Sequence, residues 1–181
     1  MSGGSGLRVA VLTVSDAGAR GEREDRSGAE CARWAEARGA VVAARAVVPD
    51  ERAAIVRQLL AWCDRDDAVD LVLTTGGTGL GPRDVTPEAT RAVLEREAPG
   101  IAERLRQASA ERVPRAALSR GVAGARGRTL VVNLPGSPGG VRDFLAALDP
   151  IVDHACAVLG GRVTEHAEPG TTSGGAGEGG A

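Results

Sequence analysis

The segment TTGGTGLGPRDVTPE, residues 74–88, combines a nearly bare backbone with one acidic residue shortly before a helix start. The glycines of GGTG at 76–79 leave backbone N–H groups accessible to an anionic ligand, and Thr75 and Thr78 could add hydroxyl groups. Asp84 follows a few positions later. The segment therefore predicts a loop that binds phosphate oxygens beside a carboxylate.

Three other polar segments each follow an apolar run that reads as a strand. Ser15 and Asp16 follow the first run, Asp50 follows the second, and PGSP at 135–138 follows a later one. PGSP could hold a second anion, because its serine stands at a helix start. Since Asp50 and Asp84 would repel phosphates, we expect a magnesium ion between them. The pattern predicts one cleft for two phosphorylated ligands or one long ligand.

Each of these residues also has a purely structural interpretation. Asp50 could equally be the N-cap of the helix that follows it. Asp16 could close an Asx turn, and Asp84 could pair with Arg83 or shape the turn before the next helix. Ser137 could be only a helix cap. Because all of these segments should meet at one edge of a sheet, their coincidence favours the functional interpretation.

The apolar runs predict an α/β fold with a mostly parallel sheet. Residues 7–14, 40–48 and 70–75 read as strands, and the first and third are apolar enough to be buried on both faces. A helix is expected from Ser27, where SGAE fits a capping box, to about Arg38. Right-handed crossovers then place helices on both faces, in a three-layer sandwich, with the site beyond the carboxyl ends of the strands.

The second half of the chain predicts further helices and one hairpin. Thr-Pro at 86–87 is typical of a helix start, and that helix is expected to end near Glu97. Another helix begins at Pro99. Residues 121–133 read as a hairpin, so one strand of the sheet is expected to be antiparallel. A last helix starts after Ser137.

Composition restricts the chemistry that this chain can perform. Its 181 residues and formal net charge of -2 suit one α/β domain without a general attraction to nucleic acid or membranes. All 22 basic residues are arginine, which excludes a Walker-type lysine and a lysyl-adenylate intermediate. Two histidines and three widely spaced cysteines argue against a zinc site or a disulfide framework. Among the arginines, Arg120 and Arg142 could be solvated surface residues.

The ends of the chain differ in composition from its middle. We expect one domain over residues 7–162, a flexible start over residues 1–6 and a disordered glycine-rich tail over residues 163–181. The chain has no apolar run of about 18 residues, and its start lacks the features of a signal peptide. A cytoplasmic location is therefore expected.

The segment TTGGTGLGPRDVTPEAT resembles the signature of the MogA/MoaB family of molybdenum cofactor biosynthesis proteins, whose domain also occurs in gephyrin. Three further stretches agree with the family in order and spacing: TVSD at 13–16, VPDER at 48–52, and LSRGVAG with NLPGSPGG within 118–140. The likeness spans roughly residues 7–160.

This resemblance implies an enzyme that adenylates molybdopterin with magnesium ATP and releases pyrophosphate. The two acidic residues important in the family match Asp50 and Asp84, which the resemblance makes catalytic. Ser15, Asp16 and Ser119 fall in the family's substrate cleft. The family's two ligand-binding loops correspond here to Gly76, Gly77, Thr78, Gly79, Pro135, Gly136, Ser137 and Pro138.

The resemblance also implies an assembly and partners. The related domain of gephyrin forms trimers, so a homo-oligomer is expected, either a trimer or a hexamer, together with a partner for molybdenum insertion. Direct attack of a substrate phosphate on the α-phosphorus of ATP needs positioning and charge stabilisation but no enzyme nucleophile, which agrees with the missing lysines.

Two other functions stay open. The first is a paralogue that binds molybdopterin without adenylyl transfer. The second is a dinucleotide-dependent oxidoreductase, which predicts G-x-G-x-x-G after the first strand. The segment SDAGARGERED at that place spaces its glycines differently, so the sequence disfavours the oxidoreductase.

Overall fold

The computed structural model describes residues 6–162; residues 1–5 and 163–181, where a flexible start and a disordered tail were expected, lie outside the described residues. Within residues 6–162 a six-stranded sheet has the order β2-β1-β3-β6-β5-β4. β5 runs antiparallel to β4 and β6, and the other neighbouring pairs are parallel. The expected mostly parallel sheet with one antiparallel strand is confirmed. The strands are β1 (Arg8–Val14), β2 (Val41–Val48), β3 (Leu71–Thr75), β4 (Arg96–Glu97), β5 (Ala123–Arg126) and β6 (Thr129–Leu134).

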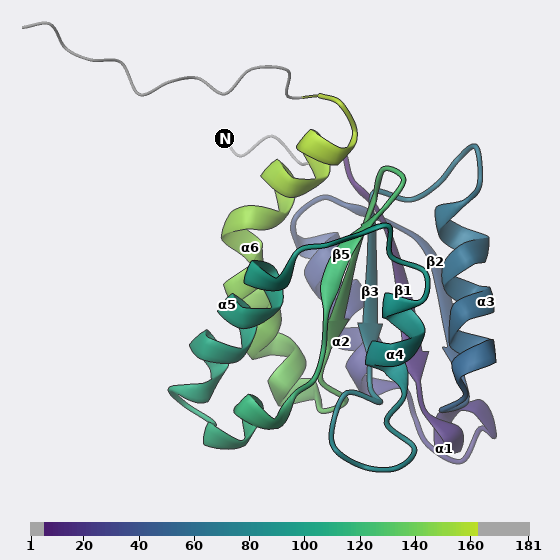
Figure 1. Ribbon diagram of the computed structural model, residues 1–181, viewed down its shortest axis with the longest axis vertical. Coiled ribbons are helices and arrows are strands. Elements are labelled where there is room, and N and C mark those ends of the chain that lie inside the picture. Colours follow the sequence, from purple (N-terminus) through teal and green to yellow (C-terminus); the bar gives the residue numbers. More distant parts are fainter. Residues whose placement is uncertain (1–5, 163–181) are drawn as a thin grey trace, which may run out of the picture.

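Helices cover both faces of this sheet, as the three-layer expectation required. α2, α5 and α6 pack on one face, whereas α3 and α4 pack on the other, as Figure 1 shows. α1 is a single turn directly after β1. The helices are α1 (Asp16–Ala19), α2 (Arg26–Ala37), α3 (Arg52–Cys63), α4 (Thr86–Arg91), α5 (Pro99–Ala110) and α6 (Pro138–Leu159), with a 3₁₀ helix η1 (Pro114–Leu118).

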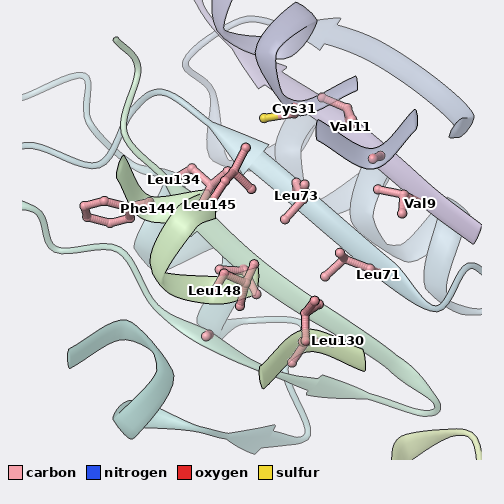
Figure 2. Packing of buried hydrophobic residues seen from close by; sticks show 14 of the residues in the cluster. Val9, Val11, Cys31, Leu71, Leu73, Leu130, Leu134, Phe144, Leu145 and Leu148 are labelled. Atoms are coloured by element: carbon pink, nitrogen blue, oxygen red, sulfur yellow. The ribbon is translucent and has the colours of Figure 1, made fainter. Parts of the chain in front are cut away.

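The alternating side chains of β1 show why its sequence is apolar throughout. Val9 and Val11 lie in the core under α2 and α6, while Ala10 and Leu12 lie in the core under α3 and α4. Figure 2 shows the first of these cores, where leucines of β3 and β6 meet Leu148 and its neighbours on α6. Burial of each large apolar side chain contributes about 1.5–3 kcal/mol. The sheet is thus a rigid platform for the loops at its end.

The register of the sheet brings the ends of four strands to one edge. Thr13 pairs with Thr75, Val14 pairs with Val48, and Thr75 pairs with Leu134. The loops that follow β1, β2, β3 and β6 therefore start side by side. This is the carboxyl edge at which the sequence placed its polar segments.

The start of α2 differs from the expectation that Ser27 caps it. Asp25 is the cap: its Oδ1 accepts hydrogen bonds from the backbone N–H of Gly28 at 2.8 Å and from Thr13 Oγ1 at 2.9 Å. Ser27 is buried inside the first turn. The aspartate cap prevails because it also fastens α2 to the end of β1, a tertiary contact that local sequence cannot reveal.

The helix after Thr86 is also shorter than expected. It ends at Arg91, and Val85 occupies the cap position, because the Thr86 hydroxyl donates to the carbonyl of Gly76 at 2.8 Å. Arg96 and Glu97 instead pair with β5 as the edge strand β4. Both residues are exposed, so no apolar pattern marked this strand. Among residues 6–162, no helix has the length and apolar character needed to span a membrane.

Candidate active site

The glycine-rich loop after β3 turns sharply against β1. Gly76 and Gly77 have φ values of 95° and 65°, in the left-handed region that favours glycine. A Cβ on Gly76 would lie 2.3 Å from the carbonyl oxygen of Val14, and one on Gly77 would lie 2.4 Å from Thr86 Oγ1. These two glycines are therefore required by packing as well as by any ligand.

The next part of the loop leaves backbone donors available. The N–H of Gly76 donates to Leu134 at 3.3 Å, which joins β3 to β6. Within residues 6–162, the N–H groups of Gly77, Thr78 and Gly79 donate to no protein acceptor. Three consecutive unpaired N–H groups fit the expected anion-binding loop.

Two clefts meet at this loop. They share Gly77 from the loop after β3, and Gly136 and Ser137 from the loop after β6. The first cleft has a volume of about 770 Å³ and extends past Ser15 and Asp50. Its outer wall is the charged segment before α2.

The second cleft, of about 570 Å³, lies on the α5 and α6 side. Thr78, Gly79, Asp84 and Ser119 line its polar wall, and Phe144 belongs to its apolar wall. The two clefts adjoin along a shared ridge of the small residues Gly77, Gly136 and Ser137. This arrangement fits the expectation of two ligands that meet end to end. Asp50 lines only the first cleft and Asp84 only the second.

Asp50 is not the N-cap of α3. The cap position is Glu51, without a side-chain hydrogen bond, so the structural interpretation of Asp50 as a cap is wrong. Asp50 Oδ2 accepts the backbone N–H of Asp16 at 2.8 Å, and Asp16 Oδ1 accepts the backbone N–H of Asp50 at 2.9 Å. The other oxygen, Oδ1, lies 3.2 Å from the position that a Cβ on Gly77 would take.

The strands that lead to Asp50 and Asp84 are not neighbours, because β1 lies between β2 and β3. The two carboxylates nevertheless influence one another. Burial raises the pKa of Asp50 above its ordinary value, and the charges of Asp16 and Asp84 raise it further, while Arg83 and the Asp16 N–H oppose the shift. Asp50 is thus more readily neutralised than an ordinary aspartate side chain.

Asp16 has the opposite environment. Arg83 donates to both of its carboxylate oxygens, at 3.1 Å from Nε and 2.8 Å from Nη2. This hydrogen-bonded pair, followed by the Asp50 N–H, holds the pKa of Asp16 below its ordinary value. Arg83 therefore pairs with Asp16 and not with Asp84, which corrects one structural interpretation of Asp84.

Asp84 closes the turn at the end of the loop. Its Oδ2 accepts the N–H of Gly81 at 2.8 Å, and a Cβ on Gly79 would lie 2.9 Å from the same oxygen. The glycine at 79 thus makes room for the carboxylate. Within the described residues, Asp84 Oδ1 takes part in no hydrogen bond and remains available to a ligand.

Arg120 holds this loop in place and is not the solvated surface residue that the sequence allowed. Its Nε donates to the Gly79 carbonyl at 2.7 Å, its Nη2 donates to the Asp84 carbonyl at 2.6 Å, and its Nη1 pairs with Glu88. Its backbone N–H donates to the Thr78 carbonyl at 2.8 Å. Only its position within the family-like stretch LSRGVAG, which begins at Leu118, could have marked it beforehand.

The sequence suggested that the Thr75 hydroxyl contacts a ligand, but the structure gives it a structural role. Its buried hydroxyl donates to the Pro135 carbonyl at 2.6 Å and so links the two ligand-binding loops. Ser137 is exposed and caps α6 by accepting the Gly140 N–H at 3.2 Å, and Pro138 is the first residue of that helix. Ser15 caps α1 in the same way, at 3.1 Å from the Gly18 nitrogen.

Asn133 is a further buried residue that organises the edge. Its Nδ2 donates to Thr74 Oγ1 and to Thr90 Oγ1, both at 2.9 Å, and its Oδ1 accepts the Val122 N–H at 3.1 Å. These bonds fasten β3, α4 and the segment before β5 to β6. A single asparagine near the end of an apolar strand gave no signal for this role.

The acidic residues here do not form a complete metal cage. Across residues 6–162, no group of three or more His, Cys, Asp or Glu side chains is placed to hold a metal ion. Asp50 and Asp84 each keep one carboxylate oxygen without a hydrogen bond in that range. Two such oxygens suit Mg²⁺, which commonly takes one or two carboxylates and completes its shell with water and substrate phosphates.

Known proteins similar to this chain belong to one family. Residues 10–154 match the family model described as a probable molybdopterin binding domain. A molybdopterin adenylyltransferase of Helicobacter pylori is 38% identical over 155 residues, which cover 84% of this chain and 88% of that protein. The molybdenum cofactor synthesis protein cinnamon of Drosophila melanogaster is 43% identical over 118 residues, but these are 65% of this chain and 20% of that protein.

A solved structure agrees with both the fold and the family. The molybdopterin biosynthesis enzyme MoaB of Thermus thermophilus superposes with a TM-score of 0.81 at 52% identity, covering 86% of this chain and 97% of that chain. The match therefore extends over most of the chain.

Proposed function

The chain belongs to the molybdopterin-binding family of molybdenum cofactor biosynthesis proteins, and from this premise we propose that it adenylates molybdopterin. A phosphate oxygen of molybdopterin attacks the α-phosphorus of ATP, the new P–O bond forms, and the bond to the leaving pyrophosphate breaks. The observation that supports this reaction best is the pair of adjoining clefts with Asp50 in one and Asp84 in the other.

The chain's own groups suit a reaction that depends on positioning. The N–H groups of Gly77, on the shared ridge, and of Thr78 and Gly79, on the adjoining wall of the second cleft, bind phosphate oxygens and stabilise the charge that develops in the transition state. Ser119 lines the second cleft, and Ser15 lines the first. Holding both substrates in line lowers the entropic part of the barrier without a covalent enzyme intermediate.

Asp50 and Asp84 are the residues that would hold Mg²⁺. When bound, the ion would neutralise phosphate charge next to the two carboxylates. Asp16 and Arg83 keep Asp50 in place through the hydrogen bonds described above. The Arg120 contacts do the same for Asp84.

The proposal also includes expectations about the active domain, the oligomeric state, the location and the partner of this protein. One domain over residues 7–162 carries the activity. The protein works as a homo-oligomer, a trimer or a hexamer, in the cytoplasm. A partner that inserts molybdenum takes up the adenylylated product.

The proposal is tested by incubating the purified full chain with molybdopterin, ATP and magnesium, and measuring adenylyl-molybdopterin and pyrophosphate. Asp84→Asn is compared with Asp67→Asn, a matched control at an exposed ion pair with Arg65. Product from the native chain and the control, with little from Asp84→Asn, supports the assignment. Molybdopterin binding without product would instead identify a binding paralogue. Equal rates from all three would remove Asp84 from the reaction.

A further inference from the structure

A third pocket lies behind the Arg120 contacts, outside the two clefts of the proposed active site. Its volume is about 320 Å³, and its walls come from α4, β4, β5, the first turns of α5 and the segment after η1. Of its lining residues only Ser119 also lines the second cleft. The proposed reaction places no substrate in this pocket, although Ser119 and Arg120 belong to its lining.

Arg106 of α5 is the reason to expect a ligand there. The residue is half-buried, and its Nη1 donates to the Gly121 carbonyl at 2.8 Å. Within the part of the chain that the structure describes, no carboxylate forms an ion pair with Arg106. A half-buried guanidinium without a counter-ion is costly, and its remaining N–H donors need acceptors.

The rest of the lining is also positive. Arg91, Arg106 and Arg120 against Glu97 give the lining residues a formal charge of +2, but Glu88, outside the lining, pairs with Arg120. Within the described residues, Arg106 is thus the lining arginine without a carboxylate partner. Glu97 lies 3.5 Å from Arg91, and both side chains are about half exposed, which makes this pair weak. The other walls are apolar or uncharged, and such walls strengthen the field of the arginines.

We propose that this pocket binds a small, multiply charged oxyanion of the phosphate or pyrophosphate class. Planar guanidinium groups bind such oxygens through paired N–H donors, and the Ser119 hydroxyl can add another. The volume is at the lower end of the range for small-molecule sites, which favours a compact ion over a nucleotide. Arg120 connects the pocket to the carbonyls of Gly79 and Asp84.

The test is calorimetric titration of the full chain with inorganic phosphate, and separately with pyrophosphate, in a phosphate-free buffer at fixed ionic strength. Arg106→Gln is expected to weaken binding by about tenfold, since it removes a charge-assisted contact. Arg91→Gln, an exposed change that leaves the core untouched, should weaken it severalfold. Arg65→Gln, which changes charge equally at a distant exposed site, should leave binding unchanged. Thermal melting without phosphate shows whether each variant is folded.

The active-site clefts could also take phosphate, so Ser137→Ala is included as the counter-test. Loss of binding in Arg106→Gln and Arg91→Gln, with binding kept in Ser137→Ala and Arg65→Gln, supports the third pocket. Loss only in Ser137→Ala places the ion in the clefts and overturns the proposal, as does no measurable binding by the native chain. The outcome is independent of whether the protein transfers adenylyl groups.

Discussion

Asp16 and Asp50 exchange hydrogen bonds, each carboxylate accepting the backbone N–H of the other residue, at 2.8 and 2.9 Å. The exchange fastens α1 to the loop after β2. It also places side by side two carboxylates whose pKa values are shifted in opposite directions. Arg83 keeps Asp16 ionised, whereas burial raises the pKa of Asp50. The pH dependence of this protein should therefore follow Asp50.

Replacing Asp50 by Asn should lower the rate of adenylyl transfer by about a hundredfold or more, because charge stabilisation of this kind is worth that much. The amide can still accept the Asp16 N–H, so the loop should stay in place. Steady-state kinetics of Asp50→Asn are compared with those of Asp67→Asn. A rate within a few-fold of the native value would contradict a role for the Asp50 charge.

The same variant should change the dependence of stability on pH. Since the folded-state pKa of Asp50 is raised, its contribution to stability is fully present below its ordinary value of 3.8 and is lost as the pH rises through the folded-state pKa. The melting temperature of Asp50→Asn, relative to the native chain, should accordingly increase from pH 4 towards neutrality (about 7). A constant difference across this range would mean that Asp50 has no raised pKa.

Arg83 should tune Asp50 in activity measurements. Because the Arg83 charge lowers the pKa of Asp50, Arg83→Gln should move the acidic limb of the pH–rate profile to higher pH. Its effect on stability should be below about 1 kcal/mol, since Arg83 is well exposed. Arg65→Gln, which loses a comparably exposed pair with Asp67, serves as the control. An unshifted profile in Arg83→Gln would argue that Asp50 does not control this limb.

Alanine at Gly76 or Gly77 should destabilise the fold by roughly 1–3 kcal/mol, because both positions combine a positive φ with a severe Cβ clash. Gly100→Ala is the matched control: it lies in α5, and a Cβ there meets nothing within 4 Å. That change should stabilise by about 0.5–1 kcal/mol. Denaturant titration separates the two outcomes, and an unaltered midpoint for Gly76→Ala would contradict the packing role.

Arg120→Lys should reduce kcat by about a hundredfold while leaving most of the stability, because lysine cannot contact Gly79, Asp84 and Glu88 together. A merely structural residue would lower the melting temperature without changing kcat of the folded fraction. Arg128→Lys, at an arginine that also donates to a backbone carbonyl, provides the comparison. Equal kcat values for the two variants would remove Arg120 from loop positioning.

Much of the architecture was predictable because its signals are local. The apolar runs of β1 and β3 marked strands buried on both faces, and Ser137 with Pro138 marked the start of α6. The two-residue strand β4 was missed, because its residues are exposed and pair only when β5 offers an open edge. The Asp25 cap was missed for a related reason, since its advantage comes from Thr13 on another element.

By itself, the sequence determined the family, the order of strands and helices apart from β4, and the segments that meet at the carboxyl edge, because glycine motifs, caps and apolar periodicity act over a few residues. Only the tertiary structure decided the partners within that edge. It paired Arg83 with Asp16 instead of Asp84 and placed Arg120 against the glycine-rich loop. It also placed Arg106 at a pocket where, among residues 6–162, no carboxylate forms an ion pair with it. Such pairings join residues far apart in the chain, and long side chains choose among several neighbours only once the packed elements fix their distances.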